Sequence, residues 1–201
     1  MERGEFFCYD VDTEDKKTAP VGRGAINDYQ WLDNDHCAAI AAGKAVILYD
    51  RARNTLDDIA ALPGHCNRIG EPSPDGRFAF CAGLGAGVLV DFKMKTAVPV
   101  TAGAGTLWVA NDTFAFSREV PDSDLRGMWL QTVGEGERRI SPEPYLVSKT
   151  GAALLKLASV GSVAFLTTHG LSTMKPDGTA LARIVPLANP PSQVLEIELW
   201  K

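Results

Sequence analysis

Short apolar stretches alternate with polar turns along most of the chain, and one form of this alternation recurs. An apolar stretch, an acidic residue, a polar turn and a second apolar stretch follow one another at residues 8–21, 48–59 and 90–100. The acidic residues Asp10, Asp50 and Asp91 lie 40 and 41 residues apart. The same form returns more weakly in LQTVGEGERRI and TMKPDGTALARIV. The pattern therefore predicts five β-hairpins at a near-constant period.

A second kind of strand pair lies between these hairpins. Its turns fall at residues 33–35, 75–76, 111–112 and 161–162, where Asp-Gly and Asn-Asp are typical turn formers. The flanking residues are rich in Val, Ile, Phe and Trp, which favour strands. GAALLKLASV at 151–160 has the composition of a helix. Its place in the repeat nevertheless predicts an inner strand.

Four short strands in each unit of about 40 residues are typical of a β-propeller blade. The stretch SPDGRFAFCAGLGAGVLVDFKMKTAVPV at 73–100 resembles a blade of the TolB-like and WD-repeat-like propellers, in which an SPDG turn joins the two inner strands. The Trp-Asp and Gly-His signatures of true WD repeats do not recur in register. The resemblance implies an all-β propeller fold, and it implies no activity, because propellers serve as enzymes, binders and scaffolds.

Counting the repeats predicts a single domain, 1–201, with five blades, closed into a ring by pairing of the two termini. Closure would remove the exposed sheet edges. The carboxyl end supplies one strand where two are needed, so a three-stranded closing blade and a fragment of a larger propeller remain alternatives. The expected blades are residues 1–24 with 187–201, then 25–64, 65–104, 105–144 and 145–186.

Charge and composition exclude several classes of partner. The chain has 20 basic and 25 acidic residues and no Lys/Arg cluster, so we expect no nucleic-acid partner. Its longest apolar runs are shorter than the roughly 20 residues that span a bilayer, so we expect no membrane partner. The start lacks a signal-peptide pattern, which favours the cytoplasm. Four cysteines without a CxxC pair favour free thiols.

Glycine-rich GLGAGV at 83–88 is not a dinucleotide-binding fingerprint. Its glycines fall at every second residue, and the stretch that follows reads as a strand, whereas a pyrophosphate site needs the start of a helix. TAGAGT at 101–106 repeats the form. Both stretches are therefore interpreted as loops of the propeller, where glycine allows tight reversals.

The resemblance implies that ligands bind on one face of the ring, where the loops between second and third strands meet those between blades. Arg23, Lys44 and His65 belong to this face. The longest interruption of the repeat, REVPDSDLRG at 118–127, also falls there, and long loops in compact domains are often functional. We expect these residues to contact a protein or peptide partner and not to catalyse a reaction. The predicted partner-binding residues are Arg68, Arg118, Glu119, Asp122, Asp124, Arg126, Tyr145 and His169.

The chain is thus expected to be a non-catalytic binding module or interaction scaffold that needs no cofactor; a small-molecule ligand remains open. The alternative is a propeller-type hydrolase or lactonase with a divalent metal near the axis. One candidate set of metal ligands is Asp122 with Asp124. A second set is the two His-Cys pairs, 36–37 and 65–66, but their spacing does not match usual zinc sites. GxSxG is absent, and His65 and His169 are the candidate bases on that face.

Overall fold

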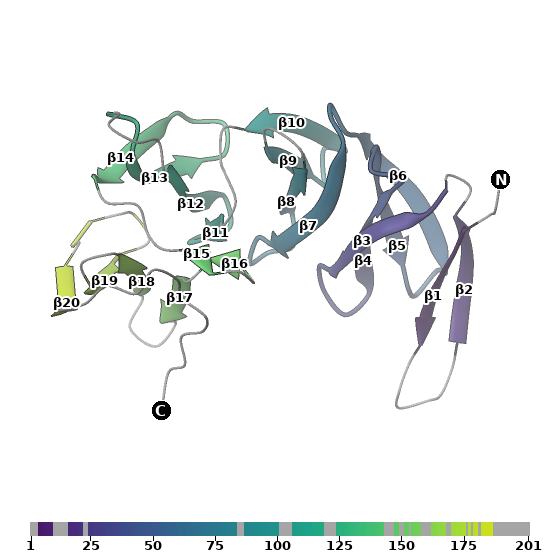
Figure 1. The fold of residues 1–201 in the computed structure, drawn as a ribbon. Coiled ribbons are helices and arrows are strands. Elements are labelled where there is room, and N and C mark those ends of the chain that lie inside the picture. The colour runs from purple at the N-terminus through teal and green to yellow at the C-terminus, as the bar shows by residue number, and fades with distance from the viewer. Residues whose placement is uncertain are drawn as a thin grey trace. The chain divides into compact units, whose positions relative to one another are not determined.

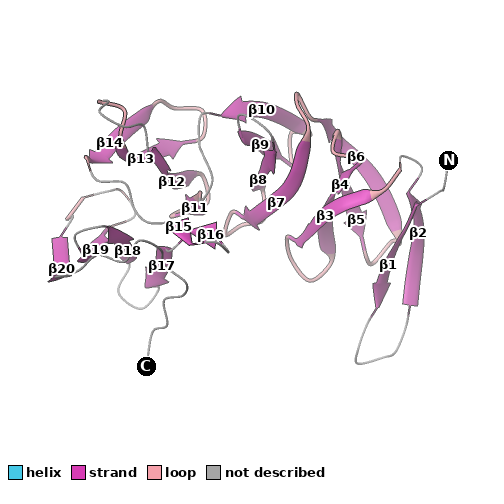
Figure 2. Cartoon of the chain, in the orientation of Figure 1, coloured by secondary structure: helices cyan, strands magenta, loops and turns pink. Residues whose placement is uncertain are grey.

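The structure is a computed structural model of residues 1–201. It describes residues 4–9, 16–21, 24–83, 87–100, 106–118, 124–142, 147–148, 151–152, 154–157, 162–167, 170–175, 177, 179–180 and 182–186. The chain divides into two compact units, residues 1–101 and 102–201. Every regular element in the described part is a β-strand (Figure 1, Figure 2), and no helix there could cross a bilayer.

Unit 1 begins with a two-stranded sheet and continues with two four-stranded antiparallel sheets, in which neighbouring strands follow one another along the chain. The strands of the first pair are β1 (Gly4–Tyr9) and β2 (Lys16–Val21). The next sheet contains β3 (Ile26–Trp31), β4 (His36–Ala41), β5 (Ala45–Asp50) and β6 (Thr55–Ala61). The third contains β7 (Cys66–Pro72), β8 (Phe78–Gly83), β9 (Gly87–Asp91) and β10 (Thr96–Val100).

Unit 2 has the same organisation, with two four-stranded antiparallel sheets and a small two-stranded sheet. The first sheet contains β11 (Leu107–Trp108), β12 (Thr113–Arg118), β13 (Gly127–Thr132) and β14 (Glu137–Ser141). The small sheet pairs β15 (Val147–Ser148) with β16 (Gly151–Ala152). The last contains β17 (Leu154–Leu157), β18 (Ser162–Thr167), β19 (Gly170–Met174) and β20 (Ala182–Pro186).

These pairings confirm the hairpins that the sequence predicts. The five outer hairpins form as β1–β2, β5–β6, β9–β10, β13–β14 and β19–β20. The stretch with helical composition contains the inner strand β17, as its place in the repeat requires. The β15–β16 hairpin was not predicted. The carboxyl-terminal stretch 187–201, on which ring closure depends, lies outside the described residues, so closure and the number of blades stay predictions.

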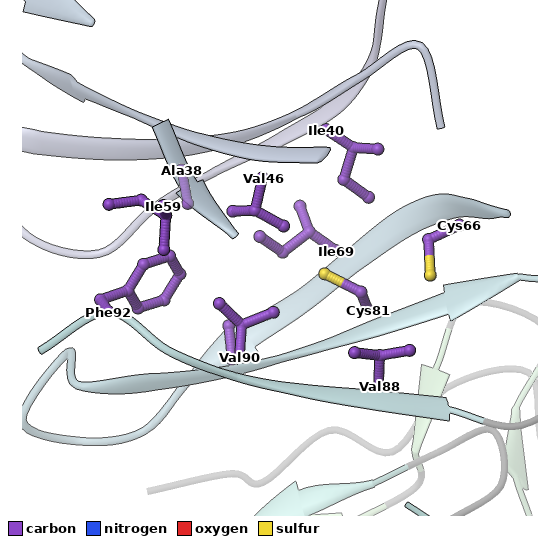
Figure 3. Close-up of a cluster of buried hydrophobic side chains, with 11 residues drawn as sticks. Ala38, Ile40, Val46, Ile59, Cys66, Ile69, Cys81, Val88, Val90 and Phe92 are labelled. Atoms are coloured by element: carbon purple, nitrogen blue, oxygen red, sulfur yellow. The ribbon is translucent and has the colours of Figure 1, made fainter. Parts of the chain in front are cut away.

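Two sheets of unit 1 enclose an apolar core (Figure 3). Because successive side chains of a strand point to opposite faces, each sheet offers every second residue to this layer. The core residues are Ala38, Ile40, Val46 and Ile59 from the sheet β3–β6, and Cys66, Ile69, Ala79, Cys81, Val88, Val90 and Phe92 from the sheet β7–β10 and the turn after β9. In unit 2, Met174 of β19 joins a smaller cluster made otherwise by Val109, Ala115, Met128 and Leu130.

The SPDG turn between β7 and β8 explains one of the repeated acidic residues. The Ser73 hydroxyl donates to Asp75 at 2.7 Å and accepts the N–H of Phe78 at 2.9 Å. The next residue after the turn glycine, Arg77, donates to both carboxylate oxygens of Asp91 at 2.8 and 3.3 Å. Burial raises the pKa of Asp91, but the Arg77 hydrogen bond and N–H groups of the following turn outweigh it and hold that pKa below its ordinary value. The acidic residue therefore joins the two hairpins of one sheet.

Candidate functional site

The candidate site is the loop at residues 118–127 in unit 2, which joins β12 to β13. Arg118 ends β12 and is paired with Gly127, which begins β13. Residues 119–123 lie outside the described part of the chain, so the site is built here from the two ends of the loop. Both ends depend on one residue of β13, Trp129.

Trp129 contacts the amino end of the loop through the face of its ring. The guanidinium carbon of Arg118 lies 4.5 Å from the centre of the Trp129 ring and 5.1 Å from that of Phe116. The same guanidinium forms an ion pair with Glu137 of β14 at 2.8 Å. The Arg118 side chain is 13% exposed, so the cation–π contacts and the ion pair are partly shielded from water, which strengthens both.

The same tryptophan binds the carboxyl end of the loop through its N–H group. Trp129 Nε1 donates to the carbonyl oxygen of Leu125 at 2.9 Å. The cross-strand pairing of Phe116 with Trp129 places the indole beside the start of the loop. Leu125 lies four residues before Trp129, and its carbonyl oxygen is within reach of the indole N–H. One side chain of the sheet therefore holds both ends of the loop.

Gly127 is required where the loop enters β13. Its φ of 137° lies in a region that other residues rarely adopt. A Cβ atom at this position would collide with the backbone oxygen of Ser141 on β14. Immediately before it, Asp124, Leu125 and Arg126 are all exposed, and half of the Leu125 surface is accessible. The loop therefore presents an acidic, an apolar and a basic side chain in sequence beside a fixed backbone.

The predicted partner-binding residues have different outcomes. Arg118 is at the site, where its ion pair and ring contacts give it a positioning role that the sequence did not reveal. Asp124 and Arg126 are exposed in the loop, and their role in binding stays a prediction. Arg68 is exposed on β7, in unit 1. The remaining four residues lie outside the described part of the chain: Glu119, Asp122, Tyr145 and His169.

Trp129 is the residue of the site that sequence reasoning missed. It is half-buried, and its role depends on the register between β12 and β13. The equal length of β12 and β13, the strands on either side of the loop, could have indicated this role. When such strands pair end to end, Phe116, two residues before the end of β12, lies opposite Trp129, two residues after the start of β13.

In unit 1, Lys44 and His65, which the sequence assigns to one face, lie in two loops that contact each other. Lys44 belongs to the turn between β4 and β5, and His65 to the connection between β6 and β7. The N–H of Cys66 donates to the carbonyl of Gly43 at 2.9 Å, which joins the two segments. The His65 ring lies so close to Gly43 that a Cβ atom there would collide with it. Arg23, assigned to the same face, lies outside the described residues.

The two His-Cys pairs are not brought together. Cys37 lies in one apolar cluster of unit 1 and Cys66 in another, while His36 contacts Asp33 at 2.9 Å. In the described part of the chain, no three His, Cys, Asp or Glu side chains are grouped as metal ligands would be. The free, buried thiols of Cys37, Cys66 and Cys81 are as predicted, and burial, with Cys66 and Asp28 nearby, raises the pKa of Cys81 to about 12.

Comparison with known proteins gives structural matches and no sequence matches. No protein-family model and no curated protein sequence matches the chain. An oligogalacturonate lyase from Vibrio parahaemolyticus is similar in structure, with a TM-score of 0.59 and 12% identity over 95% of this chain and 61% of the lyase. An oligogalacturonate lyase in complex with manganese has a TM-score of 0.55 and 13% identity over 90% of this chain and 58% of that protein.

The chain therefore spans about three fifths of the length of these lyases. A β-propeller domain from Myceliophteria thermophila matches with a TM-score of 0.49 and 17% identity, over 81% of this chain and 56% of that domain. TolB proteins from Agrobacterium tumefaciens and Acinetobacter baumannii match with TM-scores of 0.44 and 0.45. At such low identities the likeness concerns the fold alone. In structure the chain matches β-propeller proteins, and its four-stranded antiparallel sheets resemble their blades.

Proposed function

We propose that the chain is a five-bladed β-propeller that acts as a non-catalytic binding module, and that the loop 118–127 contacts a protein or peptide partner. One observation carries this proposal: both ends of the loop are held by Trp129, while Asp124, Leu125 and Arg126 stay exposed between them. A loop whose ends are fixed loses less conformational freedom when a partner binds. It therefore suits recognition better than an unanchored loop of the same length.

The exposed residues suit a protein surface. A half-exposed Leu125 offers apolar area to a partner, and the charges of Asp124 and Arg126 on either side set the orientation of that partner. The Arg118 side chain supports the loop from beneath by its contacts with Trp129 and Glu137. We infer that partner contacts come from the exposed residues and that Arg118 positions them.

Site-specific crosslinking tests the proposal. A photo-crosslinking amino acid is placed at Leu125 and, in a matched control, at Glu135 in the exposed turn between β13 and β14. Both proteins are irradiated in a lysate of the organism that encodes the chain. We expect one distinct adduct at position 125 that is absent at 135. The partner identified by mass spectrometry is then purified and titrated against the wild-type chain.

Substitution completes the test. Two peripheral contacts of about 0.7 kcal/mol each would together weaken binding by about tenfold in Asp124→Ala/Arg126→Ala. The control Glu135→Ala should bind as the wild type does. Equal adducts at both positions, or a partner whose affinity is unchanged in the double variant, would contradict the assignment of the loop.

An enzyme of the hydrolase or lactonase class, with a divalent metal, is the second candidate. Its support is the structural likeness to an oligogalacturonate lyase in complex with manganese. Asp122 and Asp124 are the carboxylates of the loop that could take part in such a site. Binding of a divalent cation by the purified chain would favour this candidate over the binding module.

A further inference from the structure

Strand β14 brings to the loop 118–127 an arginine that the sequence did not indicate. Arg139 lies directly opposite Trp129 in the pairing of β14 with β13, and Trp129 lies opposite Phe116 of β12. Residues that are directly paired across antiparallel strands point to the same face of the sheet. Arg139 therefore shares a face with the tryptophan that holds both ends of the loop.

The Arg139 side chain extends toward the carboxyl end of the loop. A Cβ atom placed on Gly127 would lie 3.0 Å from the Nε atom of Arg139. Gly127 begins β13 two residues before Trp129, so the arginine leaves its own position opposite Trp129 and runs along the sheet to the point where the loop ends. Because glycine has no side chain, the arginine has room to lie against the backbone there.

Arg139 and the loop residue Arg126 are both exposed and carry unpaired charges. Within the described part of the chain, neither guanidinium forms a hydrogen bond or an ion pair. Glu137, which is two residues before Arg139 on the same face of β14, is already paired with Arg118 at 2.8 Å. The carboxylate that could neutralise Arg139 is therefore engaged by another arginine, and both free guanidinium groups remain open to a ligand.

Both free arginines adjoin Gly127, one along the chain and one across the sheet. Arg126 directly precedes Gly127, and Arg139 lies against Gly127 from β14. The half-exposed Leu125 comes next, and its backbone is held by the indole N–H of Trp129. We call Leu125, Arg126 and Arg139 the basic edge of the loop. It combines two unpaired positive charges with an accessible apolar side chain on a fixed backbone.

The chemistry of the basic edge indicates an acidic ligand. A guanidinium group offers a planar set of N–H donors that matches a carboxylate. The chain as a whole has a net charge of −5, so an acidic ligand is not attracted by the overall charge and its binding must depend on a local basic site. Asp124, which is also exposed, would repel a second carboxylate and so restrict the orientation of such a ligand.

We propose that the basic edge binds an acidic peptide segment of the partner protein. A glutamate or aspartate carboxylate of that segment accepts hydrogen bonds from Arg139 and Arg126, and a neighbouring apolar side chain packs on Leu125. The proposal rests on the function proposed for the loop 118–127 and specifies the chemistry of its partner. It also adds a contact residue, Arg139, that lies outside the loop.

Fluorescence anisotropy with the full chain and fluorescein-labelled hexaglutamate at low ionic strength tests the proposal. We expect saturable binding that added salt weakens, and no comparable binding of labelled hexaglutamine. Arg139→Gln and Arg126→Gln should each weaken hexaglutamate binding by about two- to fivefold, the range expected when one exposed ion pair is lost. Arg138→Gln is the matched control, because it changes the net charge equally on the same strand. Arg138 donates to the carbonyl oxygen of Asp177, and this variant should bind as the wild type does.

A conservative variant guards against misfolding. Arg139→Lys keeps the charge and loses the planar set of donors, so it should retain part of the affinity while circular dichroism stays unchanged. Absence of saturable hexaglutamate binding would overturn the proposal, as would equal binding of hexaglutamine or an equal loss of affinity in Arg138→Gln and Arg139→Gln.

The crosslinking at Leu125 separates this proposal from the function on which it rests. A partner captured there that binds Arg139→Gln as tightly as the wild type would overturn the acidic specificity and leave the proposed function of the loop intact. Equal adducts at Leu125 and Glu135 would contradict that function, and the hexaglutamate titration would still decide whether the basic edge binds carboxylates.

Discussion

Replacing Trp129 with phenylalanine tests how the loop 118–127 is held. The substitution keeps an aromatic ring beneath Arg118 but removes the indole N–H that donates to the Leu125 carbonyl at 2.9 Å. A net hydrogen bond of this kind contributes about 1 kcal/mol. Loss of about 1 kcal/mol raises the population of the open loop about fivefold. The smaller ring also weakens the cation–π contact, so fivefold is the lower expectation.

Limited proteolysis measures this population, because trypsin cleaves after the exposed Arg126 when the loop opens. If the loop closes faster than it is cut, the cleavage rate follows the open population. Cleavage after the exposed Lys93, in the β9–β10 turn of unit 1, is the internal reference. We expect the ratio of cleavage at Arg126 to that at Lys93 to rise at least fivefold in Trp129→Phe. An unchanged ratio would refute the role of the indole.

Three further predictions concern stability and ligands. Asp91→Asn should lower the free energy of unfolding by about 1 to 2 kcal/mol at pH 7 in urea titrations. Because the folded-state pKa of Asp91 lies below its unfolded value, the difference should vanish as the pH falls through that folded pKa, and a difference that persists in acid would contradict the Arg77 pairing. Gly127→Ala should lower the melting temperature, because the φ of 137° strains an alanine and its Cβ atom collides with Ser141. Gly134→Ala, in an open turn with a φ of 84°, should lower the melting temperature less. If the chain is a binding module, adding manganese or EDTA should leave its melting temperature unchanged. A rise in melting temperature that is specific to one cation would favour the metal-dependent enzyme.

Strand pairing within each sheet could be predicted from the sequence, because it depends on local signals. Strands of similar length flank a polar turn in each outer hairpin, and Asp91, at the start of one of these turns, is bound by Arg77. The β15–β16 hairpin lacked these signals. Its strands have two residues each, too few for an alternation of apolar and polar positions to appear.

The site could be located but not described from the sequence. The break in the period marked the loop 118–127, and the exposed Asp124 and Arg126 follow from its polar composition. The roles of Arg118 and Trp129 depend on cross-strand register, which sets the side chains that meet on one face of a sheet. The sequence predicted Arg118 as a partner contact, which stays a prediction; in the structure its guanidinium lies over the ring of Trp129 and pairs with the carboxylate of Glu137.

The repeat is maintained by backbone hydrogen bonds at positions whose side chains differ. After the third strand of three successive sheets, a backbone N–H donates to a carbonyl in the turn before the second strand, and the three donors are 41 residues apart. These bonds are Arg51 to Asp35, Phe92 to Arg77 and Val133 to Asp112. Because a backbone bond places little demand on side-chain identity, the fold persists at 12 or 13% identity to the matched lyases. Side chains that bind a partner are then to be sought where the chain departs from this shared pattern, as it does at the loop held by Trp129.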